Sequence, residues 1–154
     1  MQTNYENILF EIELSAIFWD QPPRAKILVN DECKFDGAID QSTGIIKFYH
    51  KLEFGKSQQL IIHRYNKTQS QCQGEKDQIM CISKILIDGI NINNFILSRA
   101  TFCPIYPEPW ASQQVALDIQ LETILLGETY FGHNGQWCFA FTSPFWQFLI
   151  KAMN

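Results

Sequence analysis

Two apolar segments separated by a polar loop place the strongest constraint on how this chain can fold. Residues 60–65 and 79–87 are crowded with β-branched and aromatic side chains, the residue types that strands favour. Gly74 and the pair Asp88-Gly89 supply turn-forming residues on either side of the second segment. The sequence therefore predicts two β-strands that are joined by a polar loop and followed by a turn.

The N-terminal third of the chain repeats the strand signal. In segments 7–14 and 46–54, the side chains that we expect to be buried occupy every second position, the spacing by which one face of a strand meets a core. Residues 24–30 predict another strand, with two prolines before it and a turn at 30–32 after it. Strands and turns at this short spacing are typical of an antiparallel β-sandwich.

The pattern changes in the last third. Residues 103–110 contain three prolines, which remove backbone donors and fix φ. We therefore expect an extended, aromatic-bearing strap there, and neither a helix interior nor a central strand. Residues 115–126 are expected to form another strand or a pair of strands.

The final segment carries a turn signal and a helix signal. Asn134-Gly135 lies between aromatic segments, which predicts a β-hairpin. Ser143-Pro144 predicts an N-cap with proline at the first position of a short helix over residues 144–152.

A chain of 154 residues fits one domain with a core of its own. We expect residues 1–98 to form the sandwich, and residues 99–154 to pack on it as strap, hairpin and C-terminal helix. The last segments are too small to bury their own aromatic side chains, which favours a single body.

Composition excludes several classes of protein. A net charge of −4 without a cluster of Lys or Arg argues against nucleic-acid binding. No apolar run is long enough for a membrane helix, and the first residues lack the pattern of a signal peptide. An odd number of cysteines without CxxC spacing predicts reduced thiols in a cytoplasm. These cysteines are Cys33, Cys72, Cys81, Cys103 and Cys138.

No catalytic or zinc-binding pattern stands out. Three glutamates, Glu108, Glu122 and Glu128, can in principle meet across a groove, but no nucleophile, phosphate-loop or dinucleotide motif accompanies them. The three histidines share no ligand spacing with Cys or Asp. They are His50, His63 and His133. We expect the protein not to be an enzyme.

Part of the chain is similar to a family of sugar-binding proteins. Asn66, Asp77 and the segment that follows to Gly89 resemble the end of the calcium-dependent xylan-binding modules, which are jelly-roll β-sandwiches. The resemblance implies a jelly-roll fold and a glycan site at Asn66, Asp77 and a nearby Trp19. Lys67 stands where the family has an acidic residue, and Ser83 where it has a second aspartate.

The same comparison bears on calcium. Calcium takes about six to eight oxygen ligands, several of them from carboxylates. With Lys67 and Ser83 in acidic positions, we expect no cofactor; Asp77 is the one candidate calcium ligand.

A second resemblance spans most of the chain. Segments 19–23, 106–110, 132–137 and 142–146 are similar to small virion-associated proteins of tailed bacteriophages, particularly marine T4-like phages. This resemblance implies a structural or host-contacting component of the virion, made in the host cytoplasm, whose partners are other virion proteins or further copies of itself.

Two functional hypotheses follow, and neither involves nucleic acid or membrane insertion. The leading one is a non-catalytic virion structural or accessory protein that acts by protein–protein assembly. Its expected interface consists of Tyr106, Trp110, Trp137 and Trp146. The alternative is a carbohydrate-binding module that recognises a host-surface or plant-type glycan through Asn66, Asp77 and Trp19.

Overall fold

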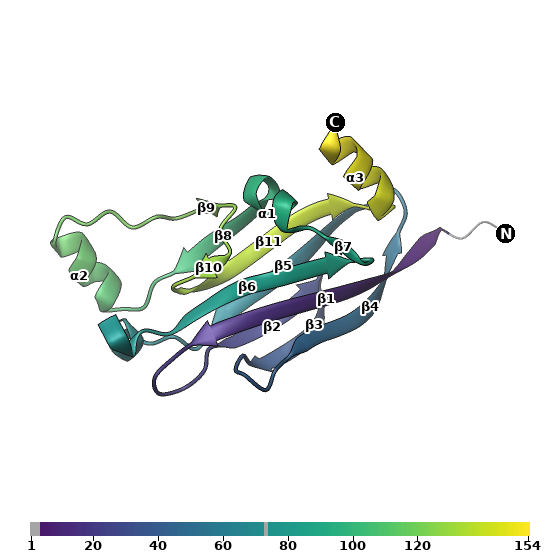
Figure 1. Cartoon of the computed structure of the whole chain (residues 1–154). Coiled ribbons are helices and arrows are strands. Elements are labelled where there is room, and N and C mark those ends of the chain that lie inside the picture. Colours follow the sequence, from purple (N-terminus) through teal and green to yellow (C-terminus); the bar gives the residue numbers. More distant parts are fainter. Residues whose placement is uncertain (1–3, 73) are drawn as a thin grey trace.

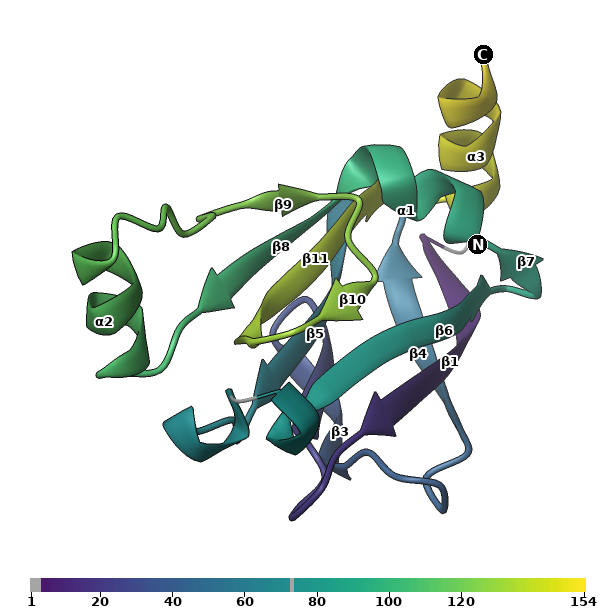
Figure 2. The ribbon, with the colours of Figure 1, turned by 60° about the vertical axis from the view of Figure 1, so that its left-hand side comes forward.

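Two antiparallel sheets face each other in the computed structural model, which describes residues 4–72 and 74–154 (Figures 1 and 2). Sheet A has the order β10-β6-β1-β4, with β7 beside β6. Its strands are β1 (Tyr5–Ile17), β4 (Ile45–Glu53), β6 (Ile79–Ile87), β7 (Ile90–Asn91) and β10 (Tyr130–Phe131). Sheet B has the order β3-β2-β5-β11-β8-β9. Its strands are β2 (Arg24–Val29), β3 (Glu32–Ala38), β5 (Ser57–Tyr65), β8 (Ala100–Ile105), β9 (Leu125–Leu126) and β11 (Asn134–Thr142).

The remaining regular elements are short helices. They are the 3-10 turns η1 (Gln69–Gln71) and η2 (Gly74–Lys76) and the α-helices α1 (Asn93–Arg99), α2 (Trp110–Ala116) and α3 (Phe145–Met153). The prediction of an all-β jelly-roll-type sandwich with a C-terminal helix is confirmed. In the described ranges, no helix has the length and apolar character needed to cross a membrane.

The core lies between the two sheets and follows from the alternation in the sequence. In β1 the side chains of Ile8, Phe10 and Ile12 are buried, while the residues between them face outward. Sheet B contributes the opposing layer, including Trp137 and Phe139. Each large apolar side chain removed from water in this way stabilises the fold by about 1.5–3 kcal/mol.

The sandwich is not confined to residues 1–98. β11 lies between β5 and β8 in sheet B, and β10 pairs with β6 in sheet A. The segment after residue 98 therefore supplies central strands of the sandwich. The physical reason is the row of large apolar residues in β11, which alternates with the period of a strand and needs an opposing sheet to be buried.

The expectation of a strap over residues 103–110 is corrected in part. Its first residues belong to β8, which pairs with β11 on one side and with β9 on the other. Pro104 is tolerated because β9 pairs only with Thr101 and Phe102, so that the proline lies beyond this pairing. The expected strands over 115–126 are also corrected, because α2 occupies the start of that range and only β9 is a strand.

The predicted hairpin at Asn134-Gly135 is wrong. β11 begins at Asn134, and the strand before it, β10, pairs in the other sheet. Asn134 accepts a hydrogen bond from the backbone N–H of Lys67 at 2.9 Å and donates one to the Lys67 carbonyl at 2.9 Å. The side chain of Asn134 thus connects the start of β11 to the loop after β5, and Asn134-Gly135 forms no tight turn between two paired strands.

The C-terminal helix is confirmed, but its cap differs from the prediction. The carboxylate of Glu6 accepts hydrogen bonds from the backbone N–H of Phe145 at 2.8 Å and from the Ser143 hydroxyl. Glu6, on the first strand, therefore caps the helix, and the Ser143 hydroxyl holds the Glu6 carboxylate in place. A carboxylate at a helix N-terminus also interacts favourably with the helix dipole.

We predict that Gly135→Ala destabilises the protein by more than about 2 kcal/mol. A Cβ at this position would lie 2.4 Å from the Cys103 carbonyl oxygen and 2.8 Å from the ring of Phe102, at a φ of 157°. Gly55→Ala is the matched control, because Gly55 has a φ of 78° but nothing within 4 Å of its Cβ position. Urea denaturation of both variants checks the difference, and equal losses of stability would contradict the packing argument.

Candidate functional site

Three loops meet at the end of the sandwich opposite α3 (Figure 1). They connect β1 to β2, β3 to β4 and β5 to β6. The end of β1 and the start of the first loop carry three consecutive exposed apolar residues. Ile17, Phe18 and Trp19 are 70%, 38% and 49% exposed. A run of this kind at a loop tip is unusual on a surface that contacts only water.

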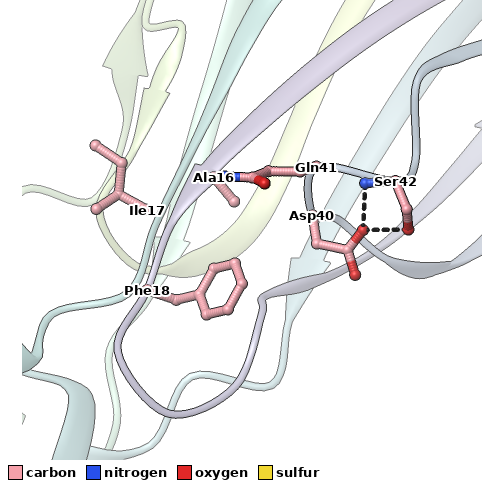
Figure 3. A pocket seen from close by; sticks show the side chains of 6 residues that line it. All are labelled: Ala16, Ile17, Phe18, Asp40, Gln41 and Ser42. Carbon is pink, nitrogen blue, oxygen red and sulfur yellow. Dashed lines mark hydrogen bonds between the residues drawn. The ribbon is translucent and has the colours of Figure 1, made fainter.

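A groove opens between the end of β1 and the β3–β4 loop. Its main cavity of about 580 Å³ is lined by Ala16, Ile17, Phe18, Asp40, Gln41 and Ser42 (Figure 3). A smaller cavity of about 220 Å³ shares Ala16, Asp40 and Gln41 and continues toward Glu13 and Gly44. We call the two cavities together the groove. One wall is therefore apolar and the other is polar.

The polar wall is fixed by a turn around Asp40. Its Oδ1 accepts hydrogen bonds from the backbone N–H of Ser42 at 2.9 Å and from the Ser42 hydroxyl at 2.7 Å (Figure 3). These bonds lower the pKa of Asp40, the hydroxyl bond most strongly. Within the described part of the chain, Oδ2 of Asp40 has no hydrogen-bond partner. An ionised, positioned carboxylate oxygen is thus free to accept hydrogen bonds from a ligand.

Contacts with the β5–β6 loop hold the β1–β2 loop in place. Gln71 donates from Nε2 to Oδ2 of Asp20 at 2.8 Å, and Gln78 donates to the Gln21 carbonyl at 3.0 Å. The ammonium of Lys76 lies 5.3 Å from the centre of the Trp19 ring, a cation–π contact. Phe18 is therefore carried by a loop that a second loop supports.

A buried cation anchors the β5–β6 loop to both sheets. The guanidinium of Arg64 donates to the carbonyls of Phe131 at 2.5 Å and Gln78 at 2.6 Å, and to Oε1 of Gln78 at 2.7 Å. Burial lowers the pKa of Arg64 to about 10, so that the group stays charged at neutral pH. Three acceptors offset part of the cost of removing this charge from water.

Lys67 provides a second buried cation in the same region. Its Nζ lies 2.5 Å from Oδ1 of Asp77 and also donates to the Gly132 carbonyl. Its side chain is 1% exposed, and that of Asp77 is 36% exposed. The ion pair connects the two ends of the β5–β6 loop, and the hydrogen bond to Gly132 joins this loop to the connection between β10 and β11.

The arrangement around Asp77 does not fit calcium. The ammonium of Lys67 already lies against the carboxylate and the carbonyl that a metal would need. Over the ranges that the structure covers, no three side chains of His, Cys, Asp or Glu come together as a metal site. A calcium ion needs several carboxylate or carbonyl oxygens at one point, and here a lysine supplies the positive charge.

The expected glycan residues lie at the same end of the sandwich but are engaged internally. Asn66 donates from Nδ2 to the Pro22 carbonyl at 3.1 Å, and Asp77 binds Lys67. Trp19 lies at the tip of the β1–β2 loop under Lys76. Asn66 and Asp77 thus support the loop that carries Phe18 and Trp19.

The four expected interface residues do not form one surface. Tyr106 and Trp110 pack around His133, with ring centres 4.7 Å and 4.9 Å from the histidine. Trp137 is a correction, because its side chain is fully buried in the core, where its alternation along β11 places it. Trp146 is 59% exposed on α3, at the far end of the molecule (Figure 1).

Phe18, Asp40 and Gln41 did not emerge from the sequence as site residues. The available signals were the apolar run 17–19 just before two prolines, and the Asp-x-Ser turn at 40–42. Neither signal indicates that the two segments face each other, because that depends on how β1 and the β3–β4 loop are placed by the two sheets.

One solved structure is distantly similar to this chain. No family model and no curated protein matches the chain. A solved structure, the selenomethionine form of vCBM60, superposes with a TM-score of 0.48 and 7% identity, over 87% of this chain and 90% of that one. That structure was described in connection with circular permutation as an evolutionary link between two families of calcium-dependent carbohydrate binding modules. Likeness at this level does not assign the chain to a family.

We predict that Lys67→Met lowers the free energy of unfolding by about 2–3 kcal/mol, below the full range for a completely buried pair because Asp77 is partly exposed. The double variant Lys67→Met/Asp77→Asn should recover part of this loss, because it leaves no unpaired charge. Calcium or a chelator should leave the wild-type melting temperature unchanged. A double-mutant cycle by thermal denaturation measures the coupling, and a rise in melting temperature with calcium would contradict the cation assignment.

We predict a loss of stability as the pH falls from about 6.5 to 4 that depends on His133. Burial, then Lys67 and Arg64, lower the pKa of His133 to about 4. The unfolded chain binds a proton near pH 6.5 and the folded one does not, so stability falls across this window. His133→Phe should flatten the dependence while keeping the aromatic packing. Chemical denaturation between pH 8 and 4 compares the two proteins, and identical slopes would exclude His133 as the cause.

Proposed function

We propose that this protein is a non-catalytic carbohydrate-binding module and that the groove holds the glycan. The observation that carries the proposal is the placement of the Phe18 ring opposite the free carboxylate oxygen of Asp40 in one open groove (Figure 3). An apolar wall facing a few fixed polar groups is the usual arrangement of a ligand site.

The chemistry of a sugar matches both walls. A pyranose ring has an apolar face of C–H groups, which an exposed aromatic ring such as Phe18 covers. Its hydroxyls donate to a carboxylate and exchange hydrogen bonds with an amide, which Asp40 and Gln41 provide. The groove is open to solvent, so that a sugar can reach both walls.

The turn at Asp40 lowers the cost of binding. The carboxylate is held by Ser42 before any ligand arrives, and the loop carrying Phe18 is held by Gln71 and Gln78. Little side-chain or loop entropy remains to be lost on binding. Because this support comes from hydrogen bonds and the Lys67–Asp77 ion pair, binding at the groove requires no metal.

A second candidate function is protein–protein assembly, which the exposed apolar side chains after β8 favour. Val115, Leu117 and Ile124 are 64%, 70% and 59% exposed. The two functions are compatible in a particle protein that also contacts a glycan. Incorporation into the virion of a tailed phage remains a prediction of this candidate.

We predict that Phe18→Ala and Asp40→Asn each weaken glycan binding about tenfold or more, a loss of about 1.4 kcal/mol. The first removes the apolar wall, and the second removes a charged acceptor. Tyr49→Ala is the matched control, because Tyr49 is 60% exposed on β4, outside the groove. A glycan array with wild-type protein identifies the sugar, and isothermal titration calorimetry then measures the variants.

Three outcomes of this experiment would count against the proposal. The first is a folded wild-type protein that binds no glycan on a broad array. The second is binding that Tyr49→Ala weakens as much as Phe18→Ala does. The third is hydrolysis of the bound glycan, which would make the protein an enzyme.

A further inference from the structure

The segment between β8 and β9 stands away from the two sheets (Figures 1 and 2). It comprises residues 106–124, contains α2, and is called the arm below. α2 buries none of its residues, although most helices of a folded protein bury one face. The arm therefore contributes little to the core of its own chain.

The surface of the arm is strongly apolar. Four of its aliphatic side chains are between 45% and 70% exposed: Val115, Leu117, Ile119 and Ile124. An open cavity of about 630 Å³ is lined by Val115, Asp118, Ile119, Gln120 and Leu121. Ile105 and Leu126, 57% and 69% exposed, lie on the strands β8 and β9 from which the arm extends. Many exposed apolar side chains on one segment indicate an interaction site.

The arm is held in a defined position at its base. The Tyr106 hydroxyl donates a hydrogen bond to the Glu122 carbonyl at 2.7 Å. This bond joins the segment that leaves β8 to the segment that returns to β9. Tyr106 and Trp110 also pack against His133. A partner therefore meets a preformed surface and pays little to order it.

The charge of the arm restricts what can cover it. Residues 100–150 contain no Lys or Arg and four carboxylates, so this segment carries the whole net charge of −4. Three of the carboxylates lie on the arm, at Glu108, Asp118 and Glu122. Two arms facing each other would bring like charges together. The complementary surface is apolar and cationic.

The chain itself carries such a surface on β4. Outward-facing residues of this strand alternate between apolar and basic side chains, with Ile45 and Tyr49 54% and 60% exposed. Lys47 and Lys51 lie between and beside them on the same face and are also exposed. Lys47 forms an ion pair with Glu11 of β1 at 3.3 Å, and Glu53 ends the outward row. β4 is the edge strand of sheet A, whereas the arm leaves the β8–β9 edge of sheet B. The two surfaces are too far apart to meet within one copy (Figure 1).

We propose that the arm of one copy docks on the outer face of β4 of a second copy. The aliphatic side chains of the arm cover Ile45 and Tyr49. The carboxylates of the arm pair with Lys51 and share Lys47 with Glu11 of β1. Because the two surfaces differ, the contact is head-to-tail and repeats, which produces a ring or a filament. This inference rests on the assembly candidate and is independent of glycan binding.

Sedimentation velocity over a concentration series tests the proposal. Wild-type protein should show a mass that rises with concentration, and added salt should weaken the assembly because the pairing is ionic at its rim. Leu117→Ser/Ile124→Ser removes apolar surface from the arm and should give a monomer. Ile90→Ser, at a 41% exposed position on β7, is the matched control and should assemble as the wild type does.

Charge reversal tests the pairing of the two surfaces. Lys47→Glu/Lys51→Glu and Asp118→Lys/Glu122→Lys should each weaken assembly about tenfold or more. Equimolar mixing of these two variants should restore head-to-tail assembly in which the variants alternate. The reversed arm meets the reversed strand, and the wild-type arm of one variant meets the wild-type strand of the other.

The proposal is overturned if wild-type protein stays monomeric at every concentration. It is also overturned if assembly persists in both the arm variant and the β4 variant, or if mixing restores nothing. Glycan binding, measured on the same variants, should be unchanged because the groove lies outside both surfaces. A protein that assembles but binds no glycan would contradict the proposed glycan binding in the groove and leave the assembly proposal standing.

Discussion

The buried guanidinium of Arg64 connects the two sheets at the end of the sandwich where the loops gather. It starts on β5 in sheet B and donates to the carbonyl of Gln78, directly before β6, and to the carbonyl of Phe131 at the end of β10; β6 and β10 belong to sheet A. An arginine in this position is costly to desolvate, and its acceptors offset the cost only while all of them stay in place. The positions of β5, β6 and β10 are therefore coupled at one point. Lys67, two residues beyond β5, is a second buried cation, and it binds the Asp77 carboxylate and the Gly132 carbonyl.

These two cations account for the shape of the loops above them. The β5–β6 loop, whose ends they fix, in turn holds the β1–β2 loop through Gln71, Gln78 and Asn66. The buried contacts of Arg64 and Lys67 thus help to set the position of the exposed Phe18 ring, through the two loops. In many small binding proteins a metal ion organises loops in this manner. Here the positive charge belongs to the chain, so it cannot be removed by a chelator.

The strands were predictable from the sequence wherever one face of a strand is apolar, as in β1, where Ile8 to Leu14 alternate with more exposed residues. β3 was not found, because its sequence is polar and neither of its faces is fully buried. Asn134-Gly135 gave the wrong turn, since its hydrogen bonds go to Lys67, which is far away in sequence. Trp137 was placed on the surface because composition alone does not tell which aromatic residues a sheet will cover. The groove and the arm depend on the relative placement of loops and edges, which local patterns do not contain.

The cap of α3 has a consequence for how the molecule presents itself. Because Glu6 at the start of β1 holds the first turn of α3, β1 begins and α3 begins at the same end of the sandwich, and the groove lies at the opposite end (Figure 1). A tether attached to either terminus would hold the molecule by its base and turn the groove outward. Immobilised through one end, the protein would offer its loops to whatever surface it approaches.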